Sequence, residues 1–384
     1  MQGTHIDTAT QWLATQQPQM ERLLEELVNI SSWTHDKAGV DAAMAVLRKA
    51  TPLPWVSIES KKFGNHTLFQ GHTPATNGGV LLVGHMDTVF PKEKFVGYTV
   101  DGNIARGPGV LDMKGGLVIV AFALQALKQA NLLEKSKLSF IVVSEEEVGS
   151  PDSCEHLLKA ATGAKAALVF ESGRKGDAII TRRKGTGFLT AVAHGKAAHA
   201  GNAHEEGINA IWAMSRFVDR VQQITDYSKG TTVNVGTFKG GIGKNTVPDL
   251  AETQIDLRFV TDEEGDLAKK RILEASKDLG VEGALLEVYF GPGRGPMKKT
   301  PQSEALMNAY AVCQKESGLG STEMGLVGGG SDAAHTAAIG IPSIDGLGPR
   351  GSGFHTLDEY VQLDSLIPKA QALVRYLVRN AIED

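Results

Sequence analysis

VLLVGHMDT, residues 80–88, is a short apolar run that ends in side chains able to bind a metal. A run rich in valine and leucine predicts a buried strand, and open α/β sheets bind ligands at the carboxyl ends of their strands. At that end His85 offers a ring nitrogen, and Asp87 offers a carboxylate that can orient the imidazole. Taken alone the pair is weak evidence, because a single histidine after a strand is more often a structural residue.

The chain on either side of this run alternates between strand and helix patterns. Predicted strands cover residues 80–83, 138–143, 166–170 and 342–345, and predicted helices cover 117–130, 303–316 and the chain from 363. Such alternation is typical of an α/β fold with a mostly parallel, doubly wound sheet and helices on both faces.

A different pattern occupies residues 182–296. Strands are predicted at 186–193, 231–238, 253–260 and 285–290, with helices at 206–223 and 263–278. The order βαββαβ suggests a ferredoxin-like α+β domain, and the turn-rich stretch GPGRGP at 291–296 marks its end. We therefore expect a catalytic domain from residues 1–181 and 297–384, with residues 182–296 inserted into it.

Composition narrows the class of protein. A formal net charge of −5 argues against a nucleic-acid partner and against attraction to an anionic membrane. Two cysteines, Cys154 and Cys313, form neither a metal-binding spacing nor a disulfide framework. The N-terminal segment has the pattern of an amphipathic helix rather than a signal peptide, and no membrane-spanning run is apparent. We expect a cytoplasmic protein.

Ligand-type side chains recur after predicted strands and in glycine-rich turns: His85, Asp112, Glu145–Glu147, Glu171 and His355. Imidazole and carboxylate ligands without thiolate suit zinc, cobalt or manganese, and this number can hold two ions. A dinuclear site needs a bridging carboxylate, and the glycines around Asp112 let its backbone approach closely. Each residue has an ordinary structural explanation, but chance does not readily account for all of them together.

The motifs HMDTVF, GPGVLDMKGG, SEEEVGS, LVFES, GKAAHAG and GFHTLDEY occur in this order along nearly the whole chain. The chain thereby resembles the aminoacylase and glutamate carboxypeptidase family of co-catalytic di-zinc peptidases, and within it the bacterial glutamate carboxypeptidases of the carboxypeptidase G type. The resemblance implies two zinc ions per subunit, one bound by His85 and Glu171, the other by Glu147 and His355, and both by the bridging Asp112. It also implies that Asp87 supports His85 and that Glu146 is the general base.

Two positions depart from the carboxypeptidase pattern. A third glutamate, Glu145, leaves open a register one residue earlier, although the distance to Gly149 favours Glu146 and Glu147 as base and ligand. Met113 stands where the carboxypeptidase has a second aspartate, and methionine is common there in acetylornithine deacetylases and desuccinylases. This second difference widens the choice of substrate and leaves the metal site unchanged.

The resemblance also suggests substrate contacts. It implies that His199 stabilises the oxyanion from the partner subunit of a homodimer, formed through the inserted domain. It places Asn245, Arg258 and Arg294 near the substrate carboxylate, and it makes Gly329 and Gly330 part of a substrate loop. For Arg258 the alternative is a solvated sheet face.

The expected function is a di-zinc metallohydrolase that releases a C-terminal amino acid, possibly glutamate, from an N-acyl or peptide substrate. The first alternative is an N-acyl amino-acid deacylase with the same mechanism, of the acetylornithine deacetylase or desuccinylase type. A non-catalytic metal-binding protein on the same fold is a further alternative, and a complete set of ligands together with the base argues against it.

Overall fold

The computed structural model describes residues 2–382 and divides the chain into two compact units. Unit 1 comprises the chain up to Arg182, Met297–Val327 and the chain from Ser331, and unit 2 comprises Arg183–Pro296 with Gly328–Gly330. The three glycines were expected in the catalytic domain and belong instead to unit 2. The reason is that buried Arg183 donates hydrogen bonds to the carbonyl oxygens of Gly329 and Gly330, at 3.1 and 3.3 Å.

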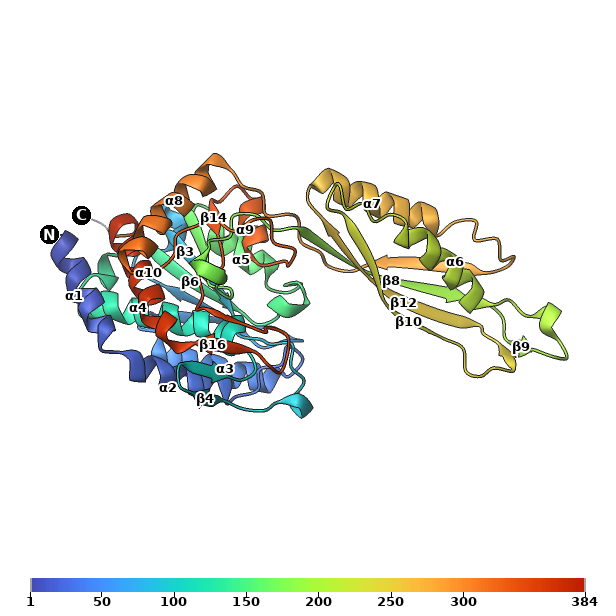
Figure 1. Ribbon diagram of the computed structural model, residues 1–384, viewed down its shortest axis with the longest axis horizontal. Coiled ribbons are helices and arrows are strands. Elements are labelled where there is room, and N and C mark those ends of the chain that lie inside the picture. The colour runs from blue at the N-terminus through green and yellow to red at the C-terminus, as the bar shows by residue number, and fades with distance from the viewer. Residues whose placement is uncertain (1, 383–384) are drawn as a thin grey trace. The chain divides into compact units, whose positions relative to one another are not determined.

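Unit 1 is built on a six-stranded sheet in the order β1-β2-β6-β3-β7-β14 (Figure 1). These strands are β1 (Trp55–Ile58), β2 (His66–Gln70), β3 (Val80–His85), β6 (Leu138–Val143), β7 (Ala166–Val169) and β14 (Ser343–Ile344). Strands β6, β3, β7 and β14 are parallel, and the hairpin β1–β2 adds an antiparallel edge that the sequence did not predict. The sheet is therefore mixed, with the predicted strands forming its parallel part.

Helices cover both faces of this sheet, as expected for a doubly wound fold. Along β3, Val80 and Leu82 pack into one hydrophobic cluster, while Leu81 and Val83 pack into another on the opposite face. The first cluster contains residues of α1 (Gln2–Ala14), α2 (Gln17–Val28), α3 (Lys37–Ala50), α4 (Gly115–Gln129), α8 (Pro301–Glu316) and α10 (Leu366–Asn380). The second contains residues of α5 (Cys154–Ala161) and α9 (Ala333–Ala338).

No stretch that could span a membrane was expected from the sequence, and residues 2–382 contain one candidate. The stretch Val110–Gln129, which ends with helix α4, has a mean hydropathy of 1.7 and is long and apolar enough for a membrane span. However, 94% of this stretch is buried inside the protein. Its hydropathy therefore reflects a helix that is surrounded by the core, and length and composition alone are weak evidence for a span.

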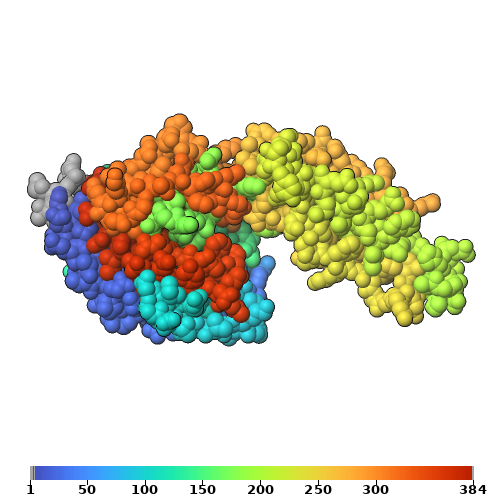
Figure 2. Space-filling model, viewed as in Figure 1, coloured from blue at the N-terminus to red at the C-terminus, as the bar shows by residue number. Residues whose placement is uncertain are grey.

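The first and last helices of unit 1 pack against each other. Gln371 of α10 donates a hydrogen bond to the carbonyl oxygen of Thr10 in α1 at 3.0 Å. Figure 2 shows the N-terminal helices, in blue, against the C-terminal part of the chain, in red. A small sheet of β4 (Thr99–Asp101), β5 (Ile104–Arg106), β15 (Gly351–Ser352) and β16 (Tyr360–Gln362) completes the unit.

Unit 2 is an antiparallel sheet in the order β10-β12-β8-β13 with two helices on one face. Its elements are β8 (Gly185–His194), α6 (Ala210–Gln222), β10 (Thr232–Gly240), β12 (Leu250–Phe259), α7 (Asp262–Ala275) and β13 (Leu285–Phe290). Their order is the predicted βαββαβ and is consistent with a ferredoxin-like domain. A short ribbon of β9 (Ala198–His199) and β11 (Thr246–Val247) extends from one end.

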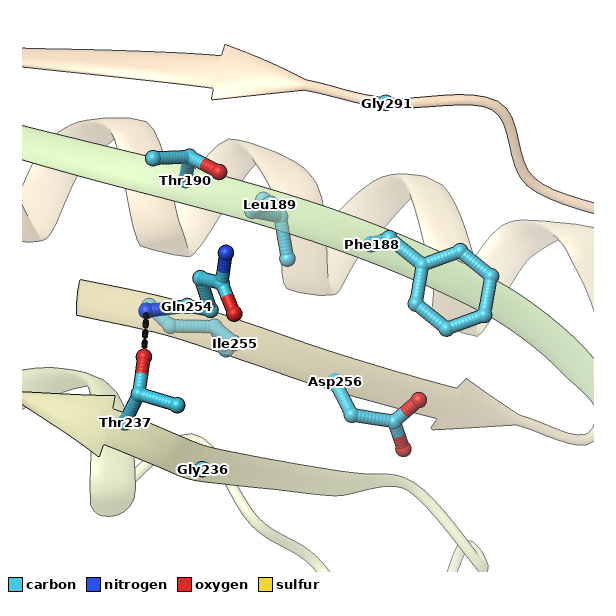
Figure 3. Close-up of a pocket in the computed structure, with 9 residues that line it drawn as sticks. All are labelled: Phe188, Leu189, Thr190, Gly236, Thr237, Gln254, Ile255, Asp256 and Gly291. Carbon is cyan, nitrogen blue, oxygen red and sulfur yellow. Dashed lines mark hydrogen bonds between the residues drawn. The ribbon is translucent and has the colours of Figure 1, made fainter. Parts of the chain in front are cut away.

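The other face of the unit 2 sheet carries no helix. Along β8, Leu189 and Ala191 are buried beneath the helices, whereas Phe188 and Thr190 point to the open side. A pocket of about 420 Å³ lies on this sheet. Figure 3 shows the residues that line it, most of them from three neighbouring strands. Alternation between a buried and an exposed face is the expected pattern for an antiparallel sheet covered on one side.

Candidate metal centre

The ligand-type residues of unit 1 meet because three neighbouring strands end at the same edge of the sheet. Strands β6, β3 and β7 are adjacent and parallel. His85 is the last residue of β3, Glu147 follows β6, and Glu171 follows β7. The carboxyl ends of parallel strands lie side by side, so these side chains converge.

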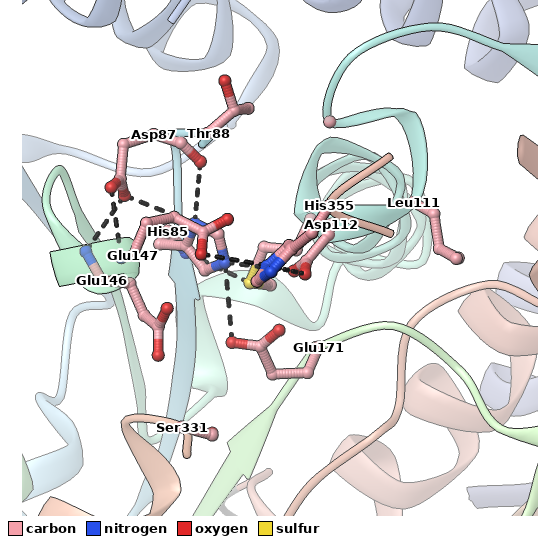
Figure 4. A network of polar contacts seen from close by, with 12 residues as sticks. His85, Asp87, Thr88, Leu111, Asp112, Glu146, Glu147, Glu171, Ser331 and His355 are labelled. Atoms are coloured by element: carbon pink, nitrogen blue, oxygen red, sulfur yellow. Dashed lines mark hydrogen bonds and ion pairs between the residues drawn. The ribbon is translucent and has the colours of Figure 1, made fainter. Parts of the chain in front are cut away.

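Asp112 and His355 reach the same place from two loops. Asp112 lies between β5 and α4, and His355 lies in the hairpin between β15 and β16. One carboxylate oxygen of Asp112 lies 3.4 Å from His85 Nε2, and the other lies 3.3 Å from His355 Nε2 (Figure 4). Glu171 lies 3.6 Å from His85 Nε2, and Glu147 lies 3.1 Å from His355 Nε2. Asp112 therefore faces two separate His–Glu pairs with its two oxygens.

The cluster contains more carboxylates than histidines, and most of these side chains are buried. Burial, the largest cause, and the neighbouring charge of Asp112 together raise the pKa of Glu171 to about 7. Burial also raises the pKa of Glu147. Hydrogen bonds to Asp112 and Glu147 raise the pKa of His355 to about 11. Carboxylates packed this closely repel one another, and a cation between them would relieve that repulsion.

Unpartnered atoms in the cluster fit a metal ion. His85 Nε2 and Asp112 Oδ1 are both buried without a hydrogen-bond partner. Among residues 2–382, two sets of ligand atoms lie within 4.8 Å of one another, His85 with Glu146 and Glu171, and His85 with Asp112 and Glu147. Imidazole nitrogen and carboxylate oxygen suit zinc and similar divalent ions. The residues present therefore fit a divalent metal.

Asp87 supports the cluster through several hydrogen bonds. Its side chain is fully buried and lies 3.4 Å from His85 Nδ1. It also accepts hydrogen bonds from the backbone N–H groups of Glu146 and Glu147, at 3.1 and 3.3 Å. The hydroxyl of Thr34 donates a further bond at 2.8 Å. Asp87 therefore joins the His85 strand to the glutamate loop, and its partner Thr34, which follows no strand or motif, was not predicted from the sequence.

The three consecutive glutamates take different positions. Glu145 is fully buried and accepts backbone hydrogen bonds from Asp152 and Ser153, at 3.1 and 2.6 Å. Its other oxygen lies 3.6 Å from the ring of His66. Only Glu146 and Glu147 contribute atoms to the metal-binding sets. The geometry therefore places Glu146 and Glu147 in the cluster and leaves Glu145 outside it.

Met113 lies beneath the cluster. It is fully buried, and its sulfur accepts a hydrogen bond from the backbone N–H of His85 at 3.2 Å. The peptide bond between Asp112 and Met113 is cis. Met113 thus packs behind the strand that carries His85 and leaves the ligand positions to other residues.

Two of the predicted substrate residues lie together at one end of unit 2. His199 pairs with Thr246 in the β9–β11 ribbon, and the backbone N–H of Ala200 donates to the carbonyl oxygen of Asn245 at 2.9 Å. The exposed ring of His199 accepts backbone hydrogen bonds at Nδ1 from Gly201 and Asn202. The neutral ring then carries its proton on Nε2, so His199 presents a hydrogen-bond donor to solvent.

The other predicted substrate residues lie elsewhere in unit 2. Buried Arg294 pairs with Thr186 at the start of β8, and its guanidinium lies beside Gly330. Arg258 faces the open side of the sheet, where its guanidinium lies 2.8 Å from the Asp256 carboxylate. For Arg258 this favours the alternative of a solvated sheet face.

Sequence and structure comparisons identify the relatives of this chain. Carboxypeptidase G2 of Pseudomonas sp. (strain RS-16) is 30% identical over 375 residues, which cover 95% of this chain and 90% of that protein. Succinyl-diaminopimelate desuccinylase of Janthinobacterium sp. (strain Marseille) is 26% identical over 366 residues, covering 90% and 95%. A tripeptidase from Staphylococcus aureus has a similar structure, with a TM-score of 0.76 at 23% identity, covering 94% and 98%.

These findings confirm the resemblance, the α/β fold class and the hydrolase class predicted from the sequence. Residues 81–379 match a single family description, and this range holds every residue of the candidate metal centre. With that match over more than half of its length, the chain belongs to Peptidase family M20/M25/M40.

Proposed function

We propose that this chain is a dinuclear zinc carboxypeptidase that releases an amino acid with a free carboxylate from an N-acyl or peptide substrate. One observation carries the proposal: the two oxygens of Asp112 face two separate histidines, each with its own glutamate. A bridging carboxylate between two such pairs is the arrangement that hydrolytic dinuclear sites need. In this reading His85 and Glu171 hold one ion, and Glu147 and His355 hold the other.

When bound, two zinc ions would polarise the scissile carbonyl group and lower the pKa of a nearby water. Glu146 is the candidate base, because it lies beside the ligand atoms of His85 and Glu171 while Glu147 is occupied with His355. It takes the proton from the attacking water and delivers it to the nitrogen of the leaving amine. Asp87 holds the Glu146 backbone and the His85 ring in place for this transfer.

The dimensions of unit 2 support a dimer. Arg294 is paired with Thr186 at the start of β8, whereas His199 follows the end of that strand at His194. Eight residue steps of about 3.3 Å separate these ends by roughly 26 Å. One small substrate cannot contact both side chains from the same copy. A site that uses Arg294 and His199 together must take them from two copies, as a homodimer provides.

Arg294 points to a substrate carboxylate. It is buried beside Gly330, and a guanidinium can bind a carboxylate through two parallel hydrogen bonds. A relative named as a carboxypeptidase fits this reading, whereas a relative named as a desuccinylase favours deacylation of an N-acyl amino acid as the second candidate. Met113, which resembles the deacylase pattern, is the feature of this chain that favours the second candidate.

The test combines metal removal with a matched pair of substrates. Chelation should abolish hydrolysis, and zinc, cobalt or manganese added back singly should restore it and identify the preferred ion. An N-acyl glutamate should be cleaved at least tenfold faster than its C-terminal amide, because a charge-assisted pair is worth about 1.5–3 kcal/mol. Equal rates would contradict recognition of the carboxylate and favour a broader amidohydrolase, and no turnover with any of the three metals would reject both candidates.

The two arginines can be separated by the same assay. Arg294→Gln should raise the Michaelis constant about tenfold or more for the acid and change it little for the amide. Arg258→Gln should leave the Michaelis constants for both substrates unchanged, because Asp256 holds that guanidinium on the open face of the sheet. If only Arg258→Gln raised the Michaelis constant for the acid, Arg258 rather than Arg294 would bind the substrate carboxylate, and this part of the proposal would be wrong.

A further inference from the structure

The mechanism above leaves one buried carboxylate beside the metal centre unused. Glu359 lies just before β16, four residues after His355, and its side chain is 1% exposed. One of its oxygens accepts hydrogen bonds from the backbone N–H groups of Leu111 and Asp112, at 2.7 and 2.9 Å. The other accepts a bond from the N–H of Gly109 at 3.1 Å. Three backbone donors of one loop, from residues 109, 111 and 112, thus converge on a single carboxylate.

The loop is shaped to present these donors. Gly109 has a φ of 75°, a conformation that other residues rarely adopt. A Cβ at this position would come within 2.5 Å of a Thr88 methyl group. Backbone N–H groups that point to one spot form a binding site for an anion. In this chain the acceptor at that spot is a side chain of the protein itself, which explains why the loop needs its glycine.

Glu359 also ties together two loops that carry ligands. His355 stands in the β15–β16 hairpin, and the same hairpin places Glu359 against the loop of Asp112. Strand β16 pairs with β5, which leads directly into that loop. The position of Asp112 relative to His355 therefore depends on the bonds that Glu359 makes.

We propose that Glu359 is a positioning residue that sets the Asp112 carboxylate across both metal positions. The proposal rests on the proposed function only in taking Asp112 and His355 as ligands. Without the Glu359 carboxylate, three buried N–H groups lose their acceptor and the loop can rotate the bridge away from one histidine. Both ions should then bind more weakly, and the ability to hold two ions together should be lost first.

Glu359 could instead act only by stabilising the fold. Rescue of metal binding by a small anion distinguishes that role from positioning of Asp112. Glu359→Ala removes a group of the size of acetate and leaves the three N–H donors in place. If those donors position the bridge, free acetate should occupy the vacated space and restore metal binding. If Glu359 only stabilises the fold, acetate should have no effect on metal affinity.

The experiment measures zinc stoichiometry and affinity by competition with a chromophoric chelator, on the full chain. Glu359→Gln and Glu359→Ala should weaken binding at least tenfold, as is typical when a partner of a metal ligand is removed. Acetate at about 0.1 M should recover most of the loss in Glu359→Ala, whereas chloride at equal ionic strength should not. The adjacent exposed Asp358 supplies the matched control, because Asp358→Asn should bind zinc as the wild type does.

The thermal midpoint of each metal-free variant completes the test. Affinities within twofold of the wild type in both Glu359 variants would overturn the proposal. It would also be overturned if affinity and thermal midpoint fell together and acetate restored neither. A wild type that binds two zinc ions but hydrolyses no substrate would reject the proposed function and leave the role of Glu359 open to the same measurement.

Discussion

The three consecutive glutamates that follow β6 have different surroundings. Glu145 is bound by backbone groups away from the cluster, Glu146 lies beside the ligands, and Glu147 contacts His355. The sequence predicted that acidic residues gather here because they follow a buried strand. It left two registers open, because the contact that holds Glu145 outside the cluster comes from His66 and the contact that holds Glu147 comes from His355, both far away in the sequence.

Substitution of the two glutamates should separate base from ligand. Glu146→Gln should retain both metal ions and hydrolyse substrate about 10²–10⁴-fold more slowly, which is the usual contribution of a general base. Glu147→Gln should lose metal as well as activity, because its oxygen faces His355 at 3.1 Å. Elemental analysis beside a rate assay checks both. If Glu146→Gln lost its metal and Glu147→Gln kept it, the two roles would be exchanged.

At the scale of elements, most long segments were predicted from the sequence and most short strands were not. The parallel strands, α4 and all six main elements of unit 2 were expected, whereas the 14-residue helix α3 was not. Strands β1 and β2 and the small sheet of β4, β5, β15 and β16 were also not predicted, because two to five residues give too little periodicity. That small sheet carries Glu359 and His355 into the centre, so the missed positioning residue follows from a missed element.

Helix α10 contains a buried cation that should make stability depend on pH. Burial lowers the pKa of Lys369 to about 8, although Asp177 at 3.4 Å raises it. Between about pH 8 and 10.5 the unfolded chain keeps a proton that the folded protein has lost, so the free energy of unfolding should rise with pH. The gain should approach about 3 kcal/mol over this range. Below pH 8 this contribution should be constant.

Urea unfolding of wild type and Lys369→Met at several pH values checks this prediction. The difference between the two proteins isolates Lys369, because other titrating groups contribute equally to both. The wild type should gain stability relative to the variant as the pH rises from 8 to 10.5. Parallel curves over that range would show that Lys369 stays charged in the folded protein.

At the scale of the whole molecule, the proposed dimer raises the question of which copy supplies His199. The sequence predicted two domains and an active site completed by a partner subunit, the latter only by resemblance. The structure adds a physical argument, because roughly 26 Å of β8 lies between Thr186, which pairs with Arg294, and His194, after which the chain continues to His199. The strand at 186–193 was predicted from the sequence, but the pairing of Arg294 with Thr186 at its start was not, so the sequence alone did not give this separation.

A mixing experiment decides whether His199 acts across a dimer. His199→Ala and Glu146→Gln should each be nearly inactive alone. In a mixed dimer, the His199→Ala chain supplies an intact metal centre with its base, and the Glu146→Gln chain supplies the missing histidine. Random pairing makes half of the dimers mixed, each with one complete site, so co-refolded protein should recover about a quarter of wild-type activity. If His199 acted within its own chain, no mixture of the two variants would recover activity, and the oxyanion donor would have to be sought within the same subunit.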